Sequence, residues 1–345
     1  MEPSCRLRKD EHVLRVYLDQ NKWVDLARAA AGHPRGGQFA DALTLARAGV
    51  AAGTVSFPLD MYRYWETSKR RDDRSRDDVV DTMLELSNQH TMALPFPLLD
   101  REIDLALKRR FGRPEHPRQV QEFGIGIRHI GEGRLDWPEL DLSALPDGGV
   151  SLAPGLSSRL SELINQSAEE ALLRAGPDAY RASGFAHSDS DHAERFVEFE
   201  NKVAATIATN RLTGDAIDVA VRATDFGDIR PAVTIALGRI GMTYQEFMDG
   251  INVGELISFI DDIPTRYVTN AMRSAKHRQT QQKWEPNDFA DVVALPVPAV
   301  YCDVLVTEKQ WVHRMRQGKV DRRYNTKLLA NTADLVDVLV AASAT

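Results

Sequence analysis

The sequence predicts an α/β fold in which a central parallel sheet is flanked by helices and interrupted by a mainly α-helical insertion. Short apolar runs alternate with helical patterns over residues 13–111, and the same alternation returns over residues 286–345. Helical patterns dominate the segment between them. Strands that alternate with helices are typical of parallel sheets, because neighbouring parallel strands need a crossover connection. We therefore expect an N-terminal extension at residues 1–12, one α/β domain formed by the two alternating segments, and an insertion at residues 112–285.

The first alternating segment opens with a predicted strand at residues 13–18, VLRVYL, which is rich in Val and Leu. The pattern NKWVDLARAAAG then predicts a helix that stops at Gly32, and Phe39 and Leu43 lie on the apolar stripe of a second helix at 38–52. The remaining predictions here are strands at 54–57 and 91–94 and helices from about 60 to 71, 77 to 88 and 98 to 111.

The insertion and the closing segment follow the same reasoning from periodicity. Helical patterns in the insertion cover residues 157–176, 193–211, 213–224 and 243–260. The closing segment is predicted to contain a helix at 287–295, a strand at 302–307, a helix at 308–318 and a last strand at 326–330.

Composition excludes several classes of protein. The 345 residues carry a net charge of −7, so the chain as a whole is not a general nucleic-acid adhesive, although a local basic groove stays possible. Two cysteines form no disulfide framework, which suits a reducing cytoplasm. The N-terminus lacks the apolar core of a signal peptide, and the apolar stretch at 292–300 is too short to span a membrane. We therefore expect a cytoplasmic protein without a membrane partner.

Acidic and polar residues follow the predicted strands. Asp19 and Asn21 come directly after the first strand, and Glu66 lies in the helix that follows the second strand. In open parallel sheets, ligands bind outside the carboxyl ends of the strands. Taken alone, Asp19 is more often a helix N-cap and Glu66 a solvated surface charge.

Further acids accompany the closing helix and strand. Asp288 and Asp291 are neighbours on one helix face, Asp303 begins the strand, and Thr307 and Glu308 follow it. A cap is the ordinary explanation for Asp288. Carboxylates that converge on one edge repel one another unless a cation neutralises them. Mg²⁺ and Mn²⁺ prefer oxygen ligands, so the joint placement of these acids indicates a divalent metal site.

Three segments resemble the PIN domain family of metal-dependent nucleases: VYLDQN, VSFPLDMYRYWE and DVVALPVPAVYCDVLVT. The resemblance covers about residues 13–111 and 286–340, and it implies a PIN-like α/β/α sandwich. By this match the catalytic residues are Asp19, Glu66, Asp291 and Asp303, which would also bind Mg²⁺ or Mn²⁺, with Asp288 and Glu308 as further candidate metal ligands and Asn21 and Thr307 as supporting polar residues. The family often has Asp two residues after the threonine, where this chain has Lys309 next to Glu308.

The resemblance implies a metal-dependent endoribonuclease that hydrolyses phosphodiester bonds in single-stranded or structured RNA. Such a protein would act as a toxin, a defence effector or an RNA-processing enzyme. The insertion would supply a lid, a homo-oligomer contact or a face that binds a regulatory protein, and the sequence does not choose among these. Phosphate contacts require basic residues near the acids. Two basic runs flank the acidic segments, and their candidate RNA-binding residues are Lys69, Arg70, Arg273, Lys276 and Arg278.

Two other functions compete with the nuclease. A PIN-like module that binds RNA or protein and cleaves poorly is compatible with Lys309 and with the large insertion. A phosphohydrolase of the haloacid dehalogenase type also has an Asp after its first strand, but it needs a second Asp where this chain has Asn21. We rank the phosphohydrolase last.

Overall fold

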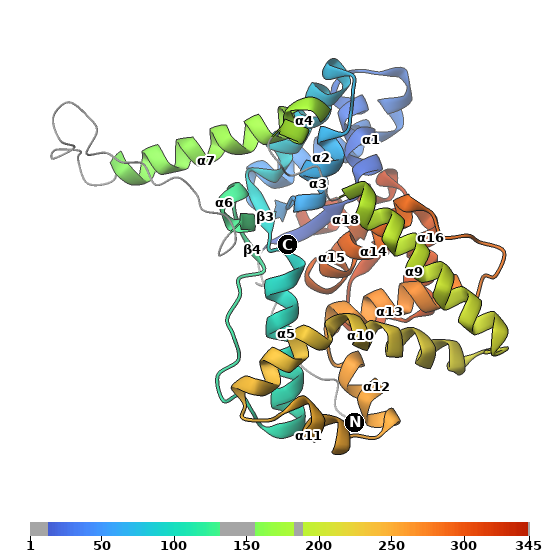
Figure 1. Ribbon diagram of the computed structural model, residues 1–345. Coiled ribbons are helices and arrows are strands. Elements are labelled where there is room, and N and C mark those ends of the chain that lie inside the picture. The colour runs from blue at the N-terminus through green and yellow to red at the C-terminus, as the bar shows by residue number, and fades with distance from the viewer. Residues whose placement is uncertain (1–12, 132–155, 183–188, 344–345) are drawn as a thin grey trace.

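Four parallel strands form the central sheet of the computed structural model, which describes residues 13–131, 156–182 and 189–343 (Figure 1). Their spatial order is β2 (Val55–Ser56), β1 (Leu14–Leu18), β5 (Val304–Val306) and β6 (Lys327–Leu329). The predicted parallel sheet is therefore confirmed, and strands from the two distant segments of the sequence lie side by side at its centre. The predicted extension at 1–12 lies outside the described residues.

An antiparallel pair continues the sheet beyond β2. β3 (His90–Met92) pairs with β4 (Phe123–Ile125), and Leu59 forms a parallel bridge to Thr91. The amide of Leu59 donates to the His90 carbonyl at 2.9 Å, and the amide of Met92 donates to the Leu59 carbonyl at 2.8 Å. The third predicted strand therefore exists but is joined to the sheet through a single bridge.

Helices cover both faces of the sheet because side chains alternate along each strand. On β1, Val16 and Leu18 belong to one core cluster and Tyr17 to another. The first cluster is completed by α1 (Gln20–Ala30), α2 (Ala40–Ala51), α4 (Asp73–Ser87) and α18 (Leu335–Ser343). The second cluster is completed by α13 (Pro264–His277), α14 (Pro286–Ala294), α15 (Pro296–Tyr301) and α16 (Lys309–Gln317).

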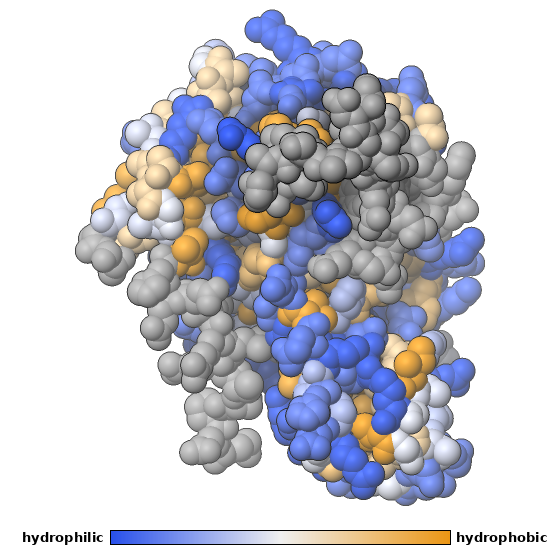
Figure 2. Space-filling view, turned by 90° about the vertical axis from the view of Figure 1, so that its left-hand side faces the viewer, coloured by the Kyte–Doolittle hydropathy of each residue, from blue (hydrophilic) through white to orange (hydrophobic). Residues whose placement is uncertain are grey.

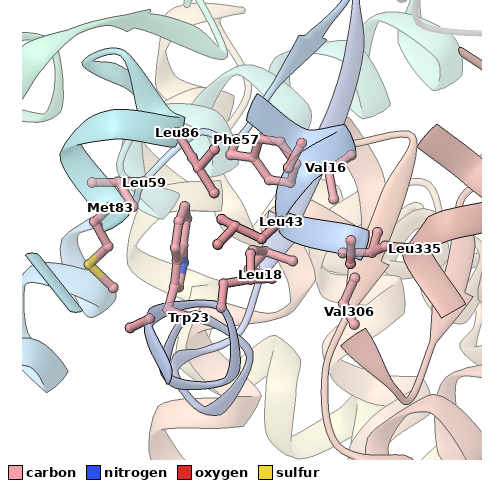
Figure 3. Close-up of a cluster of buried hydrophobic side chains, with 14 of the residues drawn as sticks. Val16, Leu18, Trp23, Leu43, Phe57, Leu59, Met83, Leu86, Val306 and Leu335 are labelled. Atoms are coloured by element: carbon pink, nitrogen blue, oxygen red, sulfur yellow. The ribbon is translucent and has the colours of Figure 1, made fainter. Parts of the chain in front are cut away.

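Trp23 is the largest side chain in the first cluster (Figure 3). Its fully buried ring lies among Leu18, Leu43 and Met83, and it meets Phe57 edge-on with 6.3 Å between ring centroids. α1 is thereby fixed against the sheet, and this packing determines the position of Asp19, the N-cap of α1.

Gly36 allows the 3-10 turn η1 (Pro34–Phe39) to lie against α1. A Cβ atom at Gly36 would come within 2.3 Å of the Arg28 carbonyl carbon, whereas one at Gly37 would meet nothing within 4 Å. We expect Gly36→Ala to lower the free energy of unfolding by about 2 kcal/mol or more, because backbone atoms must move apart. Gly37→Ala, the matched control, should change it by less than about 0.5 kcal/mol in urea unfolding. Equal effects of the two substitutions would contradict the close approach.

Three of the four predicted helical segments of the insertion correspond to α7 (Leu156–Arg174), α9 (Asp189–Thr209) and α10 (Asp215–Arg239). The segment predicted at 243–260 is two helices, α11 (Tyr244–Asp249) and α12 (Val253–Asp261), because Gly250 ends the first and Asn252 caps the second. α10, α11 and α12 pack against α5 (Pro95–Phe111) through a cluster that includes Leu107, Phe226 and Phe247. In Figure 1, the N-terminal half of α7 extends away from the rest of the chain.

α13 lies in the predicted insertion but packs against the central sheet. Its Val268 and Met272 belong to the same core cluster as Tyr17 and Leu305. Hydrophobic contacts therefore cross the predicted boundary at residue 285. Helices that the sequence pattern did not predict include α13, α15, α17 (Val320–Tyr324) and α18; the other elements are α3 (Met61–Ser68), α6 (Gly126–Gly131), α8 (Pro177–Ala182) and η3 (Thr332–Asp334).

Exposed hydrophobic side chains are scattered over the surface. Phe96 and Ile125 are among those exposed, and Figure 2 shows hydrophobic residues in small groups between hydrophilic ones on one face. Scattered exposure of this kind is normal for folded proteins. In the part of the chain that the structure describes, no helix is both long and apolar enough to cross a membrane.

Candidate metal centre

Asp19 lies where the two distant segments of the chain meet. It follows β1 and is the N-cap of α1, with its carboxylate accepting from the Gln20 amide at 2.7 Å. Because Leu18 is in register with Val306, the next residue of each strand lies at the same sheet edge. The hydroxyl of Thr307 accordingly donates to the other Asp19 oxygen at 2.8 Å. Asp19 and Thr307, which are 288 residues apart in the sequence, are thus joined by a buried hydrogen bond.

Helix α3 brings three charged residues to Asp19 at intervals of one helical turn. Asp60 caps the helix by accepting from the Arg63 amide at 2.9 Å. The Arg63 guanidinium then forms an ion pair with Asp19 through Nη1, and its Nη2 lies 3.0 Å from Oε2 of Glu66. Glu66 is therefore connected to Asp19 through a shared cation, and both carboxylates belong to one cluster.

Asp291 joins the cluster from α14. Its carboxylate accepts from the Trp311 indole N–H at 2.6 Å, which ties α14 to the first turn of α16. Burial raises the pKa of Asp291 to about 8, and the negative charge of Asp19 contributes, as do those of Glu308 and Glu66, against the opposing Trp311 hydrogen bond. A carboxyl perturbed by three other carboxylates marks a region with excess negative charge.

Glu308 and Asn21 occupy the rim of the cluster. Glu308 precedes α16, and the Asn21 amide nitrogen lies 3.4 Å from its Oε1 in a weak hydrogen bond. Glu308 also accepts from Gln310 at 2.8 Å. Asn21 and Glu308 follow β1 and β5 respectively, so they belong to the same edge of the sheet as Asp19.

The pKa values of Asp19 and Glu66 shift in opposite directions. Burial opposes ionisation of Asp19, but the charge of Arg63 and hydrogen bonds from Arg63, Thr307 and Gln20 outweigh it and lower the pKa. Burial raises the pKa of Glu66, and the charge of Arg63 compensates only in part. Arg63 therefore stabilises the charge of Asp19 more effectively than that of Glu66.

The expectation that Asp303 joins this cluster is wrong. Asp303 precedes β5, and its carboxylate accepts from the Arg15 amide at 2.8 Å at the opposite edge of the sheet. Arg15 and Asp19 are separated by four residues of extended chain, about 13 Å at roughly 3.3 Å per residue. That separation is too large for a shared metal centre, whose ions lie only about 4 Å apart.

Asp288 is also separate from the cluster, contrary to the expectation that it binds metal. Its carboxylate accepts from the Glu285 amide at 2.6 Å in the capping box that begins α14. The same oxygen lies 2.6 Å from the Lys276 ammonium, and both side chains are buried. Asp288 therefore fixes the start of α14, as its ordinary structural explanation predicted.

Two of the predicted RNA-binding residues are inside the protein. Arg273 is buried against Glu200, and Lys276 lies between Asp288 and the ring of Trp284. Neither can contact a phosphate at the surface, so the prediction is wrong for both.

The other predicted RNA-binding residues are more accessible. Arg278 is paired with Asp218 near the surface, and Arg70 donates to Ser75 at 2.6 Å. Lys69 is exposed, with its ammonium 3.1 Å from the centroid of the Trp65 ring.

Comparisons with protein-family models, with curated proteins and with solved structures found no match to this chain. The properties of the site therefore rest on its own residues.

Sequence reasoning missed Arg63 and Trp311. Arg63 stands three residues after Asp60 and three before Glu66, and this spacing puts all three on one helix face. The spacing was therefore a usable signal for Arg63. Trp311 lies in the helix after Glu308, and its sequence neighbours do not indicate that it contacts Asp291.

The donor atoms of the cluster fit a divalent cation. Carboxylates of Asp19, Glu66, Asp291 and Glu308 supply hard oxygen atoms, and Oε2 of Glu66 is buried and accepts no hydrogen bond from the described residues. Arg63 lies between Asp19 and Glu66. Within the described ranges, no three His, Cys, Asp or Glu side chains are close enough together to hold one ion. A metal would therefore need the acids to draw together around it.

Proposed function

We propose that this protein is a PIN-like, metal-dependent endoribonuclease of the cytoplasm that hydrolyses phosphodiester bonds with Mg²⁺ or Mn²⁺. The observation that carries the proposal is the placement of Asp19 and Glu308 directly after β1 and β5, with Glu66 joined to Asp19 through Arg63 and Asp291 joined to α16 through Trp311. Ligands of α/β proteins bind at the carboxyl ends of the strands. Asp19 is buried and the other three carboxylates are partly buried, and such an excess of negative charge is stabilised by a bound cation.

Each side chain of the acidic cluster would have a distinct role in the reaction. Asp19, Glu66 and Asp291 would hold the cation, which supplies Lewis acidity toward a phosphoryl oxygen and increases the acidity of a water molecule when it is bound. Thr307 orients the Asp19 carboxylate through its 2.8 Å hydrogen bond, and Trp311 orients that of Asp291. Glu308 lies at the rim in place of the acid that PIN domains often have two residues after the threonine.

RNA is the substrate that we propose. A negatively charged site binds a polyanion only where basic residues nearby contact its phosphates. Lys69 and Arg70 lie three and four residues after Glu66, and the charge of Lys69 opposes in part the burial that raises the pKa of Glu66, so Lys69 acts on the cluster. Burial lowers the pKa of Arg70 and the charge of Arg28 lowers it further, so Arg28 lies near this pair of basic residues. These three residues would contact the phosphates on one side of the scissile bond.

Metal dependence tests the proposal directly. Purified protein is incubated with end-labelled single-stranded and hairpin RNA, in EDTA and then with Mn²⁺ or Mg²⁺ in excess, and products are resolved on a denaturing gel. We expect cleavage with metal and none in EDTA, because the carboxylates alone supply no Lewis acid. Cleavage that is equally fast in EDTA, or no cleavage with either metal, would contradict the proposal.

A second candidate function is a PIN-like module that binds RNA or a protein with little catalysis. The position of Arg63 favours it, because a guanidinium already neutralises Asp19 without metal. RNA binding measured by fluorescence anisotropy, together with intact RNA in Mn²⁺, would support this second function over the first.

A further inference from the structure

Arg63 is a fully buried cation at the centre of the acidic cluster. Arg63 is only 2% exposed, and its side chain is among the largest fully buried ones in the described residues. The guanidinium pairs with Asp19, lies 3.0 Å from Glu66, and has its Nε 3.5 Å from Asp60. Arginine stays ionised in proteins, so this charge is permanently present among the acids.

The fold holds Arg63 in this place from two sides. The helical spacing of Asp60, Arg63 and Glu66 puts all three on one face of α3. The Tyr17 hydroxyl donates to Asp60 at 2.8 Å, and the Arg63 guanidinium carbon lies 5.5 Å from the centroid of the Tyr17 ring. Asp60 is occupied by the helix cap and by Tyr17, which leaves Asp19 and Glu66 as the acids that Arg63 neutralises.

The pairing with Glu66 is incomplete. Although the charges are close, Oε2 of Glu66 and Nε of Arg63 are both buried without a hydrogen-bond partner among the described residues. The 3.0 Å ion pair with Arg63 Nη2 is therefore this oxygen's only contact of that kind among the described residues, and a divalent cation would coordinate it directly. Asp19 and Glu66 are thus the acids for which Arg63 and a metal ion would compete.

We infer that Arg63 is a tethered counter-ion that competes with the divalent metal for Asp19 and Glu66. This inference rests on the proposed metal-dependent function. Without metal, the guanidinium neutralises the two acids and lets the site fold. Two cations held a few ångströms apart repel each other strongly when partly shielded from water, so metal binding requires Arg63 to release at least one carboxylate. The affinity of the protein for metal is weaker as a consequence.

Substituting Arg63 separates this role from an ordinary structural one. We compare wild type with Arg63→Gln and Arg63→Lys, and measure Mn²⁺ binding by calorimetry and thermal unfolding in EDTA and in Mn²⁺. Arg63→Gln should lower Tm in EDTA, because Asp19 and Glu66 lose the cation that neutralises them. It should also bind Mn²⁺ about tenfold more tightly or better, and show a larger Tm increase with Mn²⁺ than wild type.

Arg47→Gln is the matched control, since it removes the same charge from an exposed pair with Glu85, in which Arg47 Nε and Oε1 lie 2.7 Å apart. Its Mn²⁺ affinity should equal that of wild type. Arg63→Lys keeps a charge but cannot pair with two carboxylates in the same way, so it should bind Mn²⁺ several-fold more tightly than wild type. This variant decides the question if Arg63→Gln does not fold.

The outcomes separate the inference from the proposed function. If wild type binds Mn²⁺ and the Arg63 variants bind it equally or more weakly, Arg63 does not compete with metal, while the metal-dependent function stands. If neither wild type nor any Arg63 variant binds Mn²⁺, the proposed function fails and the inference fails with it. Tighter binding confined to the Arg63 variants supports both.

Discussion

Asp19→Asn should abolish Mn²⁺-dependent RNA cleavage, with kcat/KM falling about a hundredfold or more. Asp19 is the carboxylate that Arg63 and Thr307 contact from opposite ends of the sequence, and its charge is needed to hold a cation. The fold should survive, because asparagine is also a good N-cap and its amide can exchange hydrogen bonds with the Thr307 hydroxyl. Initial rates on labelled RNA measure the effect, with circular dichroism to verify folding.

Asp303→Asn is the matched control for Asp19→Asn. Both substitutions remove a carboxylate next to a central strand, but Asp303 lies at the other edge of the sheet, where it accepts from the Arg15 amide. Cleavage by Asp303→Asn should stay within about twofold of wild type, since the removed charge is about 13 Å or more from the site. Equal loss in both variants, or full activity in Asp19→Asn, would remove the basis for the site.

Arg273→Met should lower the free energy of unfolding by about 3–5 kcal/mol, the usual cost of breaking a buried ion pair. Arg273 Nε lies 2.6 Å from Oε1 of Glu200, and its Nη2 donates to Thr224 at 3.1 Å. Its removal leaves Glu200 buried, with the His277 ring nitrogen 2.7 Å away as its remaining partner. Urea unfolding followed by tryptophan fluorescence measures the loss.

Arg278→Gln provides the comparison for Arg273→Met. Arg278 lies five residues further along the chain, and its side chain is 40% exposed in its pair with Asp218, so its loss should cost less than about 1 kcal/mol. If the two substitutions are equally mild and Arg273→Met instead weakens RNA binding, then the expectation from the sequence that Arg273 contacts RNA would be restored.

Low pH should destabilise the buried contacts of Glu200 with Arg273 and His277. Burial opposes ionisation of Glu200, but the His277 hydrogen bond and the charge of Arg273 outweigh it and lower the pKa. A carboxyl with a lowered pKa in the folded state stabilises the fold above its unfolded pKa of about 4.3 and stops doing so as the pH falls through the folded value. Wild type should therefore lose stability below about pH 4 more steeply than Arg273→Met.

The alternation of apolar strand and helix patterns in the sequence was sufficient to predict the α/β fold. The alternation of β1 and β2 with helices, and its return at β5 and β6, was legible because strand and helix impose different periods on apolar residues. Asp19 and Glu308 could be placed at the carboxyl edge for a similarly local reason, since each directly follows a strand. The same rule excludes Asp303, which precedes its strand and therefore lies at the amino edge.

By itself, the sequence determined the four strands of the central sheet, many of the helices and which acids follow the strands, because these properties depend on near neighbours along the chain. Only the tertiary structure decided which charges meet. Whether Lys276 and Arg273 face solvent or lie buried depends on how α13 packs against α14 and α9, and the sequence around each residue looks equally basic in either case. Arg63 became the centre of the acidic cluster for the same reason: its partner Asp19 is 44 residues away along the chain.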